Sequence, residues 1–190
     1  EPYIEVFETP SQESGYERKH LRDLVLLHVI AKLLRANKSE DDTPIMVHTT
    51  MIHTDTALDE HLRIAEIIRP IVEEYHTIDD SDLYNQINTC ATKYYPQHLK
   101  TIGNIISYYK SSHFIQIQKL FTNTEIIVLN SDKTDADTEY EYPKKLNYPP
   151  ENEVSLIVVG GHKLARGLTL EGLTVSWFAR ASKKPNYDTL

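Results

Sequence analysis

The spacing of apolar residues predicts that helices alternate with short buried strands along this chain. Apolar residues at positions 26, 29, 30, 33 and 34 follow one helix face, which predicts a helix over residues 17–36. Unbroken apolar runs bounded by turn residues indicate buried strands. Such runs occupy residues 45–50, 126–129, 154–159 and 173–178. Residues 113–121 fit a helix or a strand equally well.

Three further helices are expected between residues 56 and 111. Residues 56–59 form a capping box, and Asp79 and Asp80 are suited to cap the helix that follows them. Pro70 lies inside the first of the three helices, so we expect that helix to be kinked or split there. Because no strand is predicted among them, these helices form either an insertion or an additional helical layer.

The order of these elements favours an α/β fold with a mainly parallel sheet, because unbroken apolar strands are typical of sheets covered on both faces. The chain has 190 residues, which suits one domain or one lobe of a larger enzyme. We expect an extended entry segment over residues 1–16 and a single lobe over residues 17–190. Residues 131–153 are acidic and rich in tyrosine, and they are expected to form a surface loop.

The charge is unevenly distributed. The whole chain carries −8, residues 155–190 carry +3, and residues 1–154 carry −11. The overall sign excludes a generic basic nucleic-acid binder, although the C-terminal end is able to face phosphate. We expect residues 1–154 not to face phosphate. No apolar run reaches the roughly 18 residues that a membrane span needs.

Cysteine use and the N-terminus indicate the cellular setting. Cys90 is the single cysteine, which excludes an internal disulfide and fits a reducing compartment. Its position beside Ala91 on a helix face favours a small buried apolar role. The N-terminus lacks the basic start and apolar core of a signal peptide, so we expect a cytoplasmic protein. It also lacks an initiator methionine, and we expect the chain to begin and end inside a longer protein.

Several catalytic classes lack their motifs. The sequence has no G-x-x-x-x-G-K-[ST], H-E-x-x-H, C-x-x-C or G-x-S-x-G pattern, so this chain alone is not a P-loop NTPase. His48, His53 and His61 are candidates for a zinc site. We favour instead a strand histidine bonded to the backbone and two surface histidines. Glu17 begins an E-x-K triplet of the kind found in metal-dependent nucleases, but at a helix start it is better explained by the helix dipole.

The strongest local signal is a strand followed by Gly160 and Gly161, a short cationic helical stretch, another glycine and a second strand. Glycines at the carboxyl end of a strand let a ligand approach the backbone, and this edge binds ligands in open α/β sheets. Lys163 and Arg166 are one helical turn apart and can reach one phosphate backbone together. Thr169 and Glu171 are placed to orient an arginine or a ribose hydroxyl.

Residues 160–176, GGHKLARGLTLEGLTVS, closely resemble the signature of the "Z-one" domain family. The full name of that family describes its members as endonucleases. That family looks like a branch of helicase superfamily two, and the signature corresponds to helicase motif V in the second RecA-like lobe. Residues 45–50 are similar to the family's motif IV strand, and residues 186–190 resemble the lead-in to motif VI. The family's next elements, a Gln and a Gly-Arg pair, lie beyond Leu190. Residues 160–176 hold no nuclease motif.

The resemblance implies the second lobe of an ATP-driven helicase or translocase of a bacterial-type restriction or defence system. Its partners would be a DNA or RNA backbone and the first RecA-like lobe of the same parent chain. ATP and Mg²⁺ would bind only with that first lobe, so the fragment would be inactive alone. The implied nucleic-acid contacts are Gly160, Gly161, Lys163, Arg166, Thr49 and Thr50. The implied residues of the nucleotide cleft are Gly167, Thr169, Glu171 and Gly172.

Two other functions remain open from the sequence. A non-catalytic interaction or regulatory module would use the tyrosine-rich residues 140–148, or the helices of residues 56–111, as a docking surface. A stand-alone nuclease would depend on Glu17 and Mg²⁺, and we expect no such activity.

Overall fold

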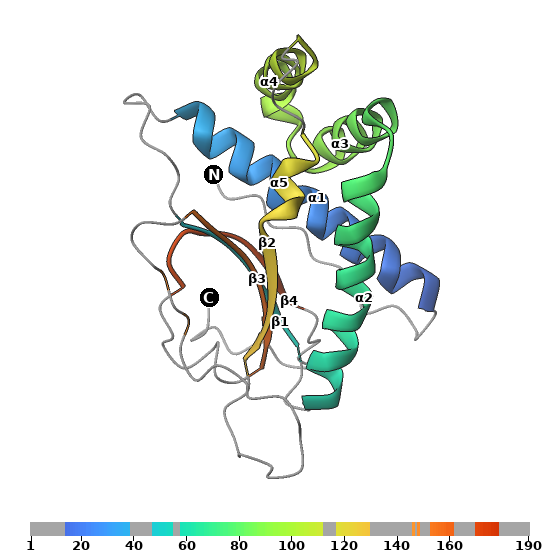
Figure 1. The fold of residues 1–190 in the computed structure, drawn as a ribbon, viewed down its shortest axis with the longest axis vertical. Helices are drawn as coiled ribbons and strands as arrows, with labels where there is room; N and C mark the ends of the chain where they lie inside the picture. The colour runs from blue at the N-terminus through green and yellow to red at the C-terminus, as the bar shows by residue number, and fades with distance from the viewer. Residues whose placement is uncertain are drawn as a thin grey trace.

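The computed structural model describes residues 14–38, 47–54, 58–111, 117–129, 146, 148, 153–161 and 170–178. Within these ranges the chain forms one sheet, with helices on one face and at one end of it (Figure 1). The helices are α1 (Ser14–Lys38), α2 (Leu58–Thr77), α3 (Asp80–Tyr94), the 3₁₀ turn η1 (Pro96–His98), α4 (Leu99–Ser111) and α5 (Lys119–Thr122). The strands are β1 (Val47–His53), β2 (Thr124–Leu129), β3 (Val154–Gly160) and β4 (Leu173–Phe178).

The sheet has the strand order β2-β3-β1-β4, and each neighbouring pair is parallel. This confirms the predicted α/β class with a mainly parallel sheet. Because the strands are parallel, their carboxyl ends meet at one edge, which we call the carboxyl edge. There Gly160 pairs with Leu129 on one side and with His53 on the other. The opposite edge, where the strands begin, is the amino edge.

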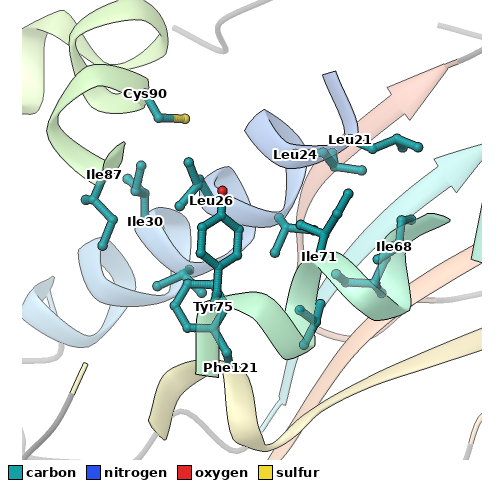
Figure 2. Packing of buried hydrophobic residues seen from close by; sticks show 14 of the residues in the cluster. Leu21, Leu24, Leu26, Ile30, Ile68, Ile71, Tyr75, Ile87, Cys90 and Phe121 are labelled. Atoms are coloured by element: carbon teal, nitrogen blue, oxygen red, sulfur yellow. The ribbon is translucent and has the colours of Figure 1, made fainter. Parts of the chain in front are cut away.

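One face of the sheet is covered by α1 and α2. Ile52, Ile157 and Val159 point from the strands into a single apolar cluster that includes residues from α1 to α4. Figure 2 shows the Tyr75 ring of α2 beside Phe121 of α5, and the two ring centroids are 5.1 Å apart. Burying each such large apolar side chain contributes about 1.5–3 kcal/mol, so this cluster is the main source of stability.

The opposite face of the sheet carries a smaller cluster. Met51, Leu129, Leu156 and Val158 are buried there, and Leu146, Tyr148 and Leu170 are among the side chains that pack against them. Alternation along the strands explains the division, since neighbouring residues of a strand point to opposite faces. Segments near residues 146–148 and 170 therefore lie on the side away from α1 and α2.

The helices between residues 56 and 111 divide into two parts. α2 packs against the sheet, whereas α3 and α4 pack against α1 and each other. Figure 1 shows α4 at the end of the molecule nearest the start of β2, away from the carboxyl edge. Ile102 and Ile106 of α4 belong to the same apolar cluster as the sheet residues. The layer is thus joined to the sheet by one continuous core.

Of the two outcomes expected at Pro70, a kink or a split of the helix, the split does not occur. α2 runs without interruption from Leu58 to Thr77, with Pro70 on its exposed side. A proline inside a helix costs about 3 kcal/mol. Ile64, Ile68 and Ile71 are fully buried on the other side of the same helix, and their burial outweighs that cost.

Other local predictions are tested by the helix ends. Asp79 caps α3 as expected, since its side chain accepts a hydrogen bond of 2.8 Å from the backbone N–H of Ser81. α1 begins at Ser14, so the helix starts three residues before the boundary expected from the sequence. Residues 119–121 of the ambiguous segment are helical, as part of α5. Two of the four residues of the predicted capping box, 56 and 57, lie outside the described residues, as does nearly all of the predicted loop 131–153.

Candidate functional site

Gly160 and Gly161 lie at the carboxyl edge, where the sequence placed them. β3 ends at Gly160, and the backbone N–H of Thr54 donates a 3.0 Å hydrogen bond to the Gly160 carbonyl. At the same edge the rings of His53 and Phe178 are 5.6 Å apart, and Phe178 is 58% exposed. Four of the predicted contacts that follow lie outside the described residues: Lys163, Arg166, Gly167 and Thr169.

Glu171 and Gly172 lie at the amino edge, directly before β4. The Thr49 backbone N–H donates to the Gly172 carbonyl at 2.9 Å, and the Thr49 hydroxyl donates to the Glu171 carbonyl at 2.7 Å. Gly160 is level with His53 and Leu173 with Thr49, so the two ends of the motif are separated by about 13 Å along β1. The sequence motif therefore belongs to two edges of the sheet.

The connection between those two edges has twelve residues, 161–172. A crossover between parallel strands needs about this many residues. Near its end, Leu170 packs on the cluster of Met51, Leu156 and Val158. The described end of the connection therefore lies on the face that α1 and α2 leave uncovered.

Gly172 is required by its own backbone. Its φ is +64°, a conformation that residues with a Cβ rarely adopt. A Cβ at this position would lie 2.2 Å from the carbonyl oxygen of Val47, which is backbone and cannot rotate away. Close packing against β1 accounts for a glycine here, and its predicted place in a nucleotide cleft stays a prediction.

Thr49 and Thr50 are both fully buried. The Thr50 hydroxyl is 2.8 Å from Nδ1 of His28, and the Thr49 hydroxyl is used by Glu171. In the described fold these two side chains hold β1 to α1 and to the turn before β4. Their predicted contact with nucleic acid stays a prediction.

The buried cluster around His28 was not found from the sequence. His28 lies on the sheet-facing side of α1, and its Nε2 is 2.9 Å from the Ser155 hydroxyl of β3. Ser155 in turn is 3.3 Å from the Thr124 hydroxyl of β2. Burial lowers the pKa of His28 well below its usual value, so the ring is neutral and has one donor and one acceptor nitrogen. Of the Thr50 and Ser155 hydroxyls, one therefore accepts a hydrogen bond from the His28 ring and the other donates one to it.

His48 and Arg35 continue this cluster toward the amino edge. Nε2 of His48 donates to the His28 backbone carbonyl at 2.8 Å, so Nδ1 is free to accept from Arg35 at 3.3 Å. The Arg35 guanidinium also donates to the carbonyls of Val47 (2.9 Å) and Gly172 (3.3 Å). Burial is the main reason why the pKa of His48 falls to about 4, and the neighbouring Arg35 lowers it further. The predicted backbone partner of His48 is confirmed.

The other histidine and cysteine predictions have mixed outcomes. His53 and His61 are buried, at 8% and 2% exposure, so their predicted place on the surface is wrong. His53 is the last residue of β1, and His61 lies in the first turn of α2. In the described ranges, no group of three or more His, Cys, Asp or Glu side chains is placed to hold a metal ion. Cys90 is buried as expected, and burial raises the pKa of its thiol.

Comparison with known proteins identifies the family. The model of the Z1 domain matches residues 20–190, which is most of the chain, so the chain belongs to the Z1 domain family. This is the family of the resemblance at residues 160–176. No curated protein and no solved structure matches the chain. Among the described helices, none combines the length and the apolar character that crossing a membrane requires.

Proposed function

We propose that this Z1-domain chain is the second RecA-like lobe of an ATP-dependent helicase or translocase that acts on nucleic acid. The family match and the α/β fold with its parallel sheet support the proposal. The observation that carries it is the end of β3 at Gly160, followed within six residues by Lys163 and Arg166. The carboxyl edge is where open parallel sheets bind their ligands, and phosphate is the ligand that this pair of cations suits.

The charge distribution is compatible with this proposal. Only the C-terminal 36 residues, with +3, include the proposed edge, and the remaining residues carry −11. A nucleic acid that touches the protein through the carboxyl edge avoids the acidic remainder. Binding of this kind is electrostatic and depends strongly on salt concentration.

The nucleotide chemistry belongs to the parent protein. The chain lacks a phosphate-binding loop of its own, so in the proposal ATP and Mg²⁺ bind with the first lobe and this chain is inactive alone. We assign Gly167 and Thr169 to the interlobe cleft. Glu171 and Gly172 stay predicted cleft residues in the proposal, and their backbone carbonyls also anchor this segment to Thr49 at the amino edge, about 13 Å along β1 from Gly160.

The test uses the 190-residue chain and fluorescein-labelled oligonucleotides, with fluorescence anisotropy measured at several salt concentrations. Lys163→Ala and Arg166→Ala are each expected to weaken binding of every sequence and to lower the salt slope by about one. Lys19→Ala, which removes an exposed lysine of α1, is the matched control. In the parent protein the same two substitutions should reduce ATP hydrolysis stimulated by nucleic acid. Unchanged binding and hydrolysis would favour the non-catalytic interaction module.

A further inference from the structure

A long stretch of this acidic chain contains no acid. Residues 83–124 have no Asp or Glu and include four lysines, so they carry +4 in a chain of net −8. The stretch covers most of α3, the turn η1, α4 and α5. Residues 1–154, with a net charge of −11, therefore include a cationic region in the helical layer. Figure 1 shows this layer at the end of the molecule away from the carboxyl edge.

The solvent-facing side of α4 concentrates this chemistry. Its exposed residues follow helical spacing, opposite the buried Ile102 and Ile106. They span about 16 Å of helix at 1.5 Å per residue. We call this surface the α4 solvent face, and it consists of Lys100, Asn104, Ser107, Tyr108 and Ser111. The Ser107 and Ser111 hydroxyls donate to the carbonyls of Gly103 and Tyr108 in the same helix. Lysine, asparagine and tyrosine are among the side chains that bond to phosphate oxygens.

Tyr108 gives the α4 solvent face a stacking platform. It is 62% exposed, whereas the other tyrosines described in residues 80–111 are half-buried or buried. Its ring meets Tyr109 edge-on at a centroid distance of 6.0 Å. Beside this pair, the Lys110 Nζ lies 4.6 Å from the Tyr84 ring centroid, so a cation is held over an aromatic ring at the margin of the face.

Nearby charges leave the α4 solvent face cationic. Asp23 of α1 accepts from Lys93 at 3.3 Å and is therefore already paired. Glu153, which acts electrostatically on Tyr109, forms an ion pair with Lys32. Asp80 of α3, which acts electrostatically on Tyr84, accepts a hydrogen bond from Gln118. None of these three acids lies on α4 itself, which has Lys100 and Lys110 as its only charged residues.

The exposed side of α2 shows what an ordinary solvated helix face looks like in this chain. It alternates Glu66, Arg69 and Glu73, and Arg63 bonds to Glu60 at 2.7 Å. Mixed signs of this kind serve solubility and contribute little binding energy. The α4 solvent face has one sign of charge, hydrogen-bonding groups and an exposed aromatic ring instead.

We propose that the α4 solvent face binds single-stranded nucleic acid, with Lys100 on a phosphate and Tyr108 stacked on an unpaired base. A single strand fits because a base inside a duplex has no free ring face for Tyr108. This inference takes from the proposed function only that the ligand is a nucleic acid. It adds a second contact region, separate from Lys163 and Arg166.

The experiment compares variants of the 190-residue chain by anisotropy with labelled oligothymidylate, oligouridylate and a duplex of equal length. Tyr108→Ala is expected to weaken binding of the single strands about tenfold, whereas Tyr108→Phe keeps the ring and should bind like the original chain. Lys100→Ala should lower the salt slope by about one, and Lys19→Ala is the control of equal charge. The two single strands distinguish a DNA from an RNA ligand.

The outcomes separate this inference from the proposed function. Loss of single-strand binding in Tyr108→Ala, with recovery in Tyr108→Phe, supports the α4 solvent face whatever Lys163→Ala and Arg166→Ala do. Loss confined to Lys163→Ala and Arg166→Ala overturns the α4 proposal and leaves the proposed function standing. Binding that is lost in Lys100→Ala but kept in Tyr108→Ala also overturns it, as does a chain that binds no single strand at low salt. An acidic protein partner would then be the better occupant of this face.

Discussion

α1 and α4 both carry polar side chains along a helix, but they use them in opposite ways. His28 of α1 is fully buried and bonds to hydroxyls of two strands, Thr50 and Ser155. Lys100 and Tyr108 of α4 are exposed to solvent. A buried polar group without its partners costs about 1–3 kcal/mol, whereas an exposed one loses little when its neighbours change.

This difference separates residues that specify the fold from residues available to a ligand. The polar atoms at the contact of α1 with the sheet are engaged by one another, from Thr124 through His28 to Arg35. Changing them should affect stability first and binding only as a consequence. Changing the α4 solvent face should affect binding and leave stability nearly unaltered. Four measurements test this contrast.

The largest effect on stability is expected from Gly172→Ala. The new Cβ would overlap the Val47 carbonyl oxygen and hold a side-chain residue at a φ of +64°. We expect a loss of at least about 3 kcal/mol in the free energy of unfolding, measured by urea titration. Gly103→Ala in α4 is the matched control, since nothing lies within 4 Å of its added Cβ. It should stabilise the chain by about 0.5–1 kcal/mol, and equal losses at both positions would contradict the packing argument.

The second largest effect on stability is expected from acid, which should protonate the buried cluster around His48. His48 has a pKa of about 4 in the folded chain, against about 6.5 when unfolded, so the unfolded chain binds more protons between these values. The contribution of His48 to the free energy of unfolding is complete above pH 6.5. About 3 kcal/mol of it is lost as the pH falls toward 4. His28 shifts in the same direction.

The measurement for this prediction is the free energy of unfolding of the original chain and of His48→Gln at pH values from 7 to 4. Carboxylates titrate in both proteins, so the difference between the two curves isolates His48. A difference that does not change with pH would show that His48 is accessible to protons in the folded chain.

His28→Leu should cost about 2 kcal/mol, because Thr50 loses its buried partner while Ser155 keeps Thr124. Thr50→Val and the double variant complete a cycle, in which we expect coupling of about 1 kcal/mol between positions 28 and 50. Chemical denaturation of the four proteins gives the numbers. Additive losses would mean that the contact between α1 and β1 depends on shape alone.

The smallest effect on stability is expected from Tyr108→Ala, within about 0.5 kcal/mol, despite the size of the side chain removed. Its ring is 62% exposed and supports little of the core. Thermal unfolding followed by circular dichroism tests this. A loss of stability comparable to that of His28→Leu would place Tyr108 among the residues that hold the fold. That result would count against the α4 proposal.

Local patterns predicted much of the fold and part of the candidate site. The four strands, the burial of Cys90 and the cap at Asp79 follow from short-range apolar spacing and from helix-end chemistry. Gly160 and Gly161 were placed correctly at the end of a strand. Of the kink or split expected at Pro70, the split does not occur, because the preference of one residue was outweighed by buried isoleucines on the same helix.

The sequence alone determined which segments become helices and strands, and that residues 155–190 are cationic. It also determined that residues 160–176 resemble the signature of a family. It did not determine that Glu171 and Gly172 lie at the opposite edge from Gly160, or that His28 meets Ser155, 127 positions away. Such pairings depend on the strand order β2-β3-β1-β4, which brings distant segments together. Periodicity records only which face of an element is apolar, whereas the partner of each face is chosen when the whole chain packs.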